Sequence, residues 1–587
     1  MAYRNGRDQA VASADFAKLA QRILQQRFLR ACVYELPLAY LVAVTANANV
    51  RRGALSLAYA FVSPRTLAYT AATYVVGVVV LAVHARLYHV TRAAHGSHFP
   101  ELQRVLRRPT QTAEAVLAYV LLASFLVVVH NGMFGGAASR MWLYPEGHYG
   151  PPQLNPGWLA SWMLASVVGT GYAVQLIADE RLQLRFPAVE QGRVHALKDR
   201  LPRGFAHAVR FALSVLVTFW VAYFVFGWGV YQNVCNVLAR IFSTSSYGVG
   251  SPLFSAGVLF SWLRSSTLTV LTWELAHQLF EVIVTEPTHI NELSLDRNLC
   301  LVSGLQNTDS PLIQHLAYQE LYRLTAFNAE QRAEILGDID RASGTMWSQV
   351  SSLCIGVVNA ATGQLQTNAP PAPEKTAAAR AASDGRGLAE QGASLRAGGA
   401  PMKDILQRNR RAAAAGQGAA AAARTAGPSA AELFGTEAQG LEKYVLTALR
   451  DMLLRSALGQ RIMSRSQRAR SISTFANFQQ QVWAIRALMR LVECSIREDK
   501  YGVVQGDVGA VLGALFAYLD ALEGSVAPLG GRAEGGAQTA GGQAEAMIQV
   551  LRNTLYAFTT TFYEYLGALK LPPAQARQLQ RFADFQA

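Results

Sequence analysis

The chain has 587 residues, of which 51% are hydrophobic and only 16% are charged, and its formal net charge is +14. The apolar residues are concentrated in the first half of the chain, so these averages describe a molecule with two different parts. The five cysteines lie far apart and no two have the spacing of a metal site or a redox motif, which excludes a disulfide framework as the organising principle.

Six apolar blocks fill the stretch from residue 29 to residue 285. The hydrocarbon core of a bilayer is about 30 Å thick and is crossed by about 20 residues of helix. Because lipid offers no hydrogen-bond partners, each span must satisfy its own backbone groups, and we expect helices. A buried soluble core would require polar helix faces, which the run from Tyr74 to Val83 lacks. The predicted spans are 29–47, 70–90, 112–133, 157–178, 209–231 and 256–284.

Basic residues alternate between the connections of these spans. The N-terminal segment 1–28 and the second and fourth connections are rich in arginine and lysine, whereas the first, third and fifth are poor in them. The positive-inside rule then places both termini on the cytoplasmic side, and an even number of spans requires the same arrangement.

Small residues repeat every four positions along the fourth span, at Ser161, Ala165, Gly169 and Ala173. They share one helix face and allow a second helix backbone to approach closely. Packing within the bundle is the favoured interpretation, and contact with another membrane protein is the alternative.

The last apolar block differs from the others because Glu274, His277 and Glu281 lie on one of its helical faces. We expect this face to turn toward the bundle or toward a following domain. A transporter or channel would require interrupted spans, internal repeats or charges paired between spans, and the sequence shows none convincingly. His195 and Asp199 lack the spacing of an acyltransferase motif, so no enzyme, catalytic residue, cofactor or metal site is predicted.

Beyond residue 285 the pattern is that of soluble α-helices. Ser310 followed by Pro311 predicts a helix start, and Asn328 with Gln331 predicts the next one. Trp347 begins the buried face of a third helix, 345–361, and we expect it to be a central packing residue.

A segment rich in alanine and glycine, 366–432, is predicted to be a disordered linker. The helical regions on either side, 286–365 and 433–587, are each small for an independent core. We therefore expect them to pack together as one soluble α-helical domain with the linker looped out.

Two features of the second helical region are candidates for function. One is a set of arginines expected on one face of a helix at 441–470, which could touch anionic lipid or could be an ordinary solvated face: Arg450, Arg461, Arg465 and Arg468. The other is the turn at Asp499, Tyr501 and Gly502, where a structural corner is favoured over a direct partner contact.

Four stretches carry a family resemblance: 310–321 (Ser-Pro-Leu-Ile-Gln-His-Leu-Ala-Tyr-Gln-Glu-Leu, with Pro311 and His315), 347–354 (Trp-Ser-Gln-Val-Ser-Ser-Leu-Cys), 498–505 (Glu-Asp-Lys-Tyr-Gly-Val-Val-Gln) and 559–566 (Thr-Thr-Thr-Phe-Tyr-Glu-Tyr-Leu). In this order they resemble the NDC-one family of six-span transmembrane nucleoporins, and the resemblance covers the whole architecture except the linker.

The resemblance implies a non-enzymatic anchor of the nuclear pore complex in the nuclear envelope. Linker nucleoporins, other pore-membrane nucleoporins and envelope lipid are the implied partners, without direct nucleic-acid binding. It also implies support of pore assembly and, in fungi, insertion of the spindle pole body. Phe434-Gly435 is an isolated dipeptide, so a permeability-barrier nucleoporin is not indicated.

Overall fold

The computed structural model describes residues 15–48, 54–91, 105–134 except 107, 142–143, 153–187, 192–222, 225, 229, 233–234, 236–237, 240, 256–341, 344–368, 475–526, 540–568 and 571–584. The predicted linker beyond residue 368 and the helix expected at 441–470 lie outside these ranges. The four arginines Arg450, Arg461, Arg465 and Arg468 lie outside them as well.

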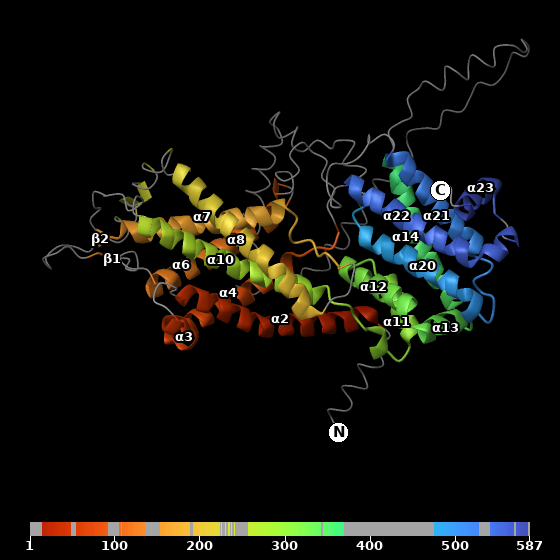
Figure 1. The fold of residues 1–587 in the computed structure, drawn as a ribbon, viewed down its shortest axis with the longest axis horizontal. Coiled ribbons are helices and arrows are strands. Elements are labelled where there is room, and N and C mark those ends of the chain that lie inside the picture. The colour runs from red at the N-terminus through yellow and green to blue at the C-terminus, as the bar shows by residue number, and fades with distance from the viewer. Residues whose placement is uncertain are drawn as a thin grey trace, which may run out of the picture. The chain divides into compact units, whose positions relative to one another are not determined.

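The first part of the chain is a bundle of long helices (Figure 1). Its elements are α2 (Phe16–Asn47), α3 (Ala54–Val62), α4 (Pro64–Leu87), α6 (Pro109–Phe134), α7 (Pro156–Ala178), α8 (Arg193–Ala222) and α10 (Ala256–Val284). Between α6 and α7 lies one antiparallel pair of two-residue strands, β1 (Trp142–Leu143) and β2 (Gln153–Leu154).

Five of these helices, namely α2, α4, α6, α7 and α8, are long and apolar enough to cross a membrane. The predicted sixth span, α10, is helical over 29 residues, but its polar residues keep it out of this apolar group. It packs chiefly against α8, α2 and α4. The outer surface of the bundle is apolar: on α6, Leu117, Leu121 and Phe125 follow one another at intervals of four residues and are all exposed. An exposed apolar stripe of this kind fits contact with lipid.

The first span and the N-terminal segment form one continuous helix, α2. Asp15 caps it by accepting a hydrogen bond from the backbone N–H of Ala17 (3.0 Å). Phe16 is fully buried, and its backbone N–H donates to Ser303 Oγ (3.2 Å) in the soluble part of the chain. A Cβ added at Gly304 would lie 2.6 Å from the Phe16 ring, which shows how closely the two segments approach. The same helix therefore belongs to the bundle at one end and to the soluble core at the other.

The soluble part consists of helices and short 3-10 turns. The elements are η5 (Asn291–Leu293), α11 (Arg297–Leu305), α12 (Pro311–Phe327), α13 (Ala329–Gly337), α14 (Met346–Asn368), α20 (Phe478–Glu498), α21 (Val508–Val526), α22 (Ala540–Thr561), η7 (Tyr563–Ala568) and α23 (Pro573–Ala583). Helix α12 packs on α20, α14 packs on α20 and α21, and α22 packs on both of these. Segments from both sides of the predicted linker thus share one core, while the looping out of 366–432 stays a prediction.

The predicted helix starts are present with different capping. Helix α12 begins at Pro311, but the Ser310 hydroxyl makes no capping hydrogen bond. Asn328 Oδ1 accepts the backbone N–H of Gln331 (3.2 Å) and caps α13 as expected. The third helix was predicted to end near residue 361 and instead continues to Asn368.

Candidate functional site

The small-residue face of α7 packs inside the chain. Ser161, Ala165 and Ala173 are buried, and a Cβ added at Gly169 would lie 2.7 Å from the backbone of Tyr119 on α6. Ser161 Oγ also accepts a hydrogen bond from Trp262 Nε1 of α10 (2.8 Å). The face therefore packs on α6 at backbone distance, and the Ser161 side chain links it to α10.

We expect Gly169→Ala to lower the unfolding temperature of the detergent-solubilised protein, because the added methyl group meets a backbone that cannot turn aside. Overpacking of this kind costs about 1–3 kcal/mol. Gly171→Ala on the same helix is the matched control, since its Cβ would lie 3.4 Å from the movable ring of Phe211. Thermal unfolding followed by tryptophan fluorescence compares the two, and equal unfolding temperatures would contradict the close α6–α7 contact.

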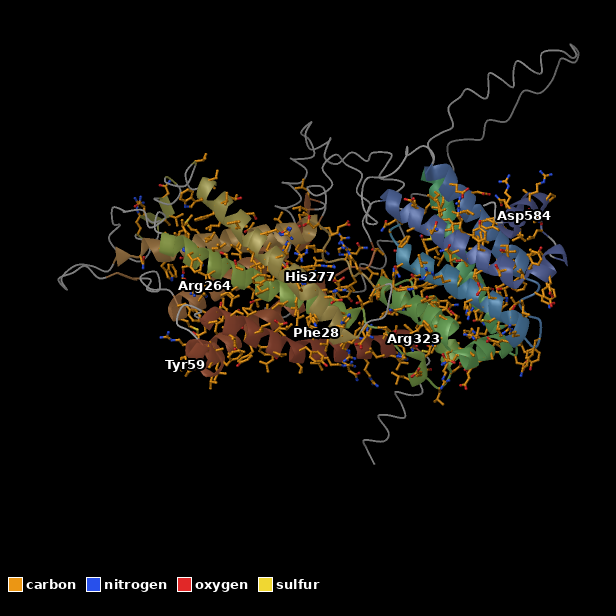
Figure 2. The ribbon with its side chains drawn as sticks, viewed as in Figure 1. Phe28, Tyr59, Arg264, His277, Arg323 and Asp584 are labelled. Carbon is orange, nitrogen blue, oxygen red and sulfur yellow. The ribbon has the colours of Figure 1, made fainter. Side chains whose placement is uncertain are left out.

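The polar face of α10 turns inward and is paired with the connection after α7 and with the first part of α8. Glu274 is 1% exposed and receives two hydrogen bonds from Arg181, at 2.7 and 2.6 Å, and one from the Tyr172 hydroxyl at 2.9 Å. Further along α10, Glu281 pairs with Arg200 (2.8 Å), and beyond its end Glu286 pairs with Arg193 (2.5 Å). Figure 2 shows the side chains along α10, with Arg264 and His277 labelled at separate positions on it.

Arg181 lies in the connection that follows α7, so its pair with Glu274 joins this connection to α10. Arg181 and Glu274 are 93 residues apart in sequence, and nothing in either local pattern connects them. The surroundings are filled by aromatic side chains, with the rings of Tyr119, Tyr172 and Trp273 only 4.9–5.0 Å apart. A bidentate pair packed in this way fixes the helices relative to one another.

The segment that leaves α10 is held by two buried charged side chains. Arg27 of α2 donates to the carbonyl oxygens of Val284 (2.8 Å) and Pro287 (2.9 Å). Glu320 of α12 accepts the backbone N–H of Asn291 (2.7 Å), and burial raises the pKa of its carboxyl to about 7. These contacts secure the passage from the bundle to the soluble domain, and no local sequence pattern predicts this role for either residue.

Two contacts join the halves of the soluble domain across the predicted linker. Trp347, 1% exposed, donates from Nε1 to Asp507 Oδ2 (2.9 Å). Arg332 makes a bidentate pair with Glu498 at 3.0 and 2.8 Å. The Arg332 guanidinium also donates to the carbonyl of Thr325 (3.0 Å), so it ties α12, α13 and α20 together.

The turn after α20 is built by Asp499. Its Oδ1 accepts the backbone N–H groups of Tyr501 (3.1 Å) and Gly502 (2.8 Å), and its Oδ2 accepts that of Val504 (2.9 Å). Gly502 has φ = +69°, a conformation that favours glycine. Asp499 and Gly502 therefore form the corner, whereas the side chain of Tyr501 is 62% exposed and is presented to solvent by it.

His315 lies in the core of the soluble domain. It is 2% exposed, its Nδ1 donates to the carbonyl of Pro311 (2.7 Å), and burial lowers its pKa to about 4. It is therefore a neutral imidazole with Nε2 left as an acceptor. Within the ranges that the structure describes, no three His, Cys, Asp or Glu side chains gather as metal ligands would.

Apolar helices with lipid-suited outer faces, which share one continuous hydrophobic core with the helical part that follows them, define a polytopic membrane protein with a helical domain beyond its spans. The family model described as "Nucleoporin protein Ndc1-Nup" matches residues 22–580, and the chain belongs to this family. It is a membrane nucleoporin of the nuclear pore, with the structural role that this membership implies.

Individual relatives agree with this membership. The chain is 23% identical to Nucleoporin NDC1 of Xenopus laevis over 513 residues, which cover 74% of this chain and 77% of the relative. It is 21% identical to Nucleoporin Ndc1 of Drosophila melanogaster, covering 71% of this chain and 72% of the relative. Nucleoporin NDC1 of Danio rerio is 32% identical over a shorter stretch, 20% of this chain and 18% of the relative.

Proposed function

We propose that the chain anchors the nuclear pore complex in the nuclear envelope by holding linker nucleoporins and other pore-membrane nucleoporins on its soluble helical domain, and that it supports pore assembly in this way. Both termini would face the cytoplasm and nucleoplasm. The observation that carries the proposal is the shared helix α2, whose Phe16 is buried on the soluble domain while its other end packs on α4 and α10. A mechanical force that bound nucleoporins exert on the soluble domain would thus be transmitted to the membrane helices through one continuous helix.

Several features support this function over transport. Glu274 is hydrogen-bonded by Arg181 and Tyr172, and aromatic rings fill the space beside it, so the charged residues of α10 serve the packing of the bundle. Insertion of the spindle pole body, in fungi, is a further role that the family resemblance implies.

Tyr501 is the residue that we assign to partner contact. An aromatic side chain exposed on a rigid turn loses little freedom on binding, which suits it to a protein interface. We expect Tyr501→Ala to leave the helical circular dichroism unchanged and to reduce the capture of a linker nucleoporin in a pull-down with the full-length protein. Truncating an interface aromatic costs about 2 kcal/mol or more, corresponding to a loss of roughly 30-fold in affinity.

Tyr563→Ala is the matched control, because Tyr563 is a similarly exposed tyrosine (68%) elsewhere in the soluble domain. Unchanged capture by a folded Tyr501→Ala variant would reject the contact at this turn. Failure of the folded wild-type protein to capture any nucleoporin, or its absence from puncta at the nuclear rim, would reject the anchoring function itself.

A further inference from the structure

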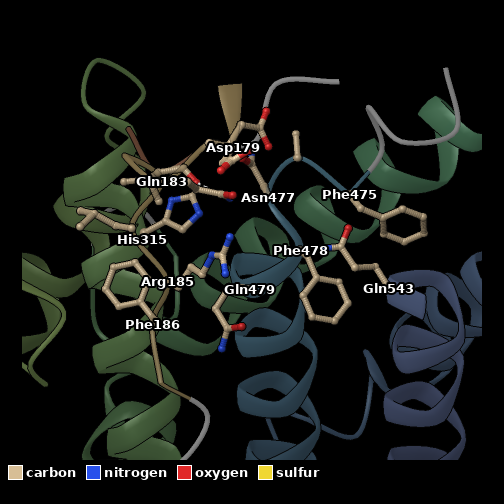
Figure 3. A pocket seen from close by; sticks show the side chains of 14 residues that line it. Asp179, Gln183, Arg185, Phe186, His315, Phe475, Asn477, Phe478, Gln479 and Gln543 are labelled. Atoms are coloured by element: carbon tan, nitrogen blue, oxygen red, sulfur yellow. Dashed lines mark hydrogen bonds between the residues drawn. The ribbon is translucent and has the colours of Figure 1, made fainter. Parts of the chain in front are cut away.

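A cavity of about 250 Å³ lies where the connection after α7 meets α12, α20 and α22 (Figure 3). Its wall includes Val90, three residues beyond the end of α4, and Asp179, which directly follows α7. Both α4 and α7 are long and apolar enough to span the bilayer. The cavity therefore lies at the level where membrane helices give way to the soluble domain, which is the level of lipid headgroups.

The wall of this cavity is rich in hydrogen-bond acceptors. Asn477 Oδ1 and Gln543 Oε1 are buried there, and neither has a hydrogen-bond partner within the described part of the chain. Asn477 occupies the position before α20, yet its side chain does not cap that helix. His315 adds a third acceptor, since its Nδ1 proton is committed to the carbonyl of Pro311 and its Nε2 carries no proton. Unused buried acceptors are costly unless a donor reaches them.

The wall of the cavity also carries charged residues of both signs. Asp179 and Glu180 contribute two adjacent carboxylates, and Arg185 contributes a guanidinium. Glu180 is buried and has φ = +51°, the single positive φ found at a non-glycine residue in the described backbone. This left-handed residue belongs to the C-terminal cap of α7, in which the backbone N–H of Arg181 donates to the carbonyl of Leu176 (3.0 Å) and that of Glu180 to the carbonyl of Ile177 (3.2 Å). The wall thus offers acceptors and negative charge to a cation, and an arginine to an anion.

We propose that this cavity binds the phosphoethanolamine headgroup of a membrane phospholipid. The primary ammonium donates its N–H groups to Asn477, Gln543 and the carboxylates, and the phosphate pairs with Arg185. A volume of 250 Å³ corresponds to roughly eight water molecules at about 30 Å³ each. This space admits a headgroup but not acyl chains, which remain in the bilayer beside α4 and α7.

The ammonium chemistry discriminates between lipids. A phosphocholine headgroup has the same charges, but its quaternary ammonium has no N–H group to donate. It would leave Asn477 Oδ1 and Gln543 Oε1 without donors. A purely anionic headgroup would place negative charge against Asp179 and Glu180. Phosphatidylethanolamine is therefore favoured over both.

The test uses the full-length protein in detergent micelles, with binding of short-chain phosphatidylethanolamine and phosphatidylcholine followed by native mass spectrometry. We expect the ethanolamine lipid to bind about tenfold more tightly or better, as loss of hydrogen bonds to a charged donor predicts. Asn477→Ala should remove most of this preference. Arg185→Gln, at an exposed position, should weaken both lipids together. Arg297→Gln, an exposed arginine outside the cavity, is the control and should bind like wild type.

Equal binding of the two lipids by the wild type would overturn the proposal. Full retention of the preference in Asn477→Ala, with the fold verified by its unfolding temperature, would overturn the assigned site. Soluble glycerophosphoethanolamine has the same headgroup without acyl chains. If it bound as tightly as the lipid, the ligand would be a solute and the membrane source would be wrong.

Discussion

Replacing Glu274 by alanine is expected to destabilise the membrane bundle by about 3–5 kcal/mol, because it leaves the Arg181 guanidinium inside the protein without its counter-charge. Arg181 is only 20% exposed and makes both of its short hydrogen bonds to this carboxylate. We expect a large fall in the yield of monodisperse protein in size-exclusion chromatography and a lower unfolding temperature in detergent.

The double variant Arg181→Met with Glu274→Met should recover much of the loss, since replacing a buried ion pair by apolar side chains of similar size is often close to neutral. Glu286→Ala is the control for charge alone, because its partner Arg193 is 41% exposed and such pairs contribute about 0–1 kcal/mol. A Glu274→Ala variant as stable as Glu286→Ala would mean that the buried pair does not hold the helices together.

Truncating Trp347 to alanine should cost the soluble domain about 3–5 kcal/mol, the usual range for a large buried aromatic side chain. The indole is 1% exposed and sits at the start of α14, where it also binds Asp507 at the start of α21. Its loss removes packing and leaves the two halves of the domain joined by fewer contacts. Circular dichroism during heating and susceptibility to limited proteolysis measure the effect.

Two further variants separate the causes. Trp347→Phe keeps much of the ring volume and removes the hydrogen bond to Asp507, so it should cost only about 1–2 kcal/mol. Phe327→Ala removes an aromatic side chain that is 75% exposed and should unfold like the wild type. Equal protease resistance in Trp347→Ala and wild type would show that the tryptophan is not central to this core.

Local sequence patterns were sufficient to predict most of the helices. The proline at 311 marks a helix start, and the spacing of Asn328 and Gln331 marks the start of the next helix. The predicted apolar blocks coincide with long helices, because a membrane span must satisfy the hydrogen bonds of its own backbone groups. Helix starts and apolar spans depend on residues that are close in sequence, so they can be predicted without knowledge of the tertiary structure.

Pairings between distant residues could not be predicted in the same way. Arg332 and Glu498 are 166 residues apart, and charged residues of both signs occur throughout the soluble region, so no local rule selects this pair. The charge of Arg181 was counted only as a basic residue outside the membrane, although its side chain turns back to Glu274 on α10. The acceptor-rich cavity likewise combines residues from five separate segments and exists only after they pack.

The continuity of α2 gives the molecule a mechanical property. A helix of 32 residues is about 48 Å long, and its two ends are fixed in different surroundings. If the bilayer becomes thinner or bends and the helix tilts by about 5°, its far end moves sideways by about 4 Å. Phe16 packs between α11 and α12, so a displacement of this end of α2 also displaces the soluble core. The local shape of the membrane and the orientation of the soluble domain are therefore coupled through the single helix α2.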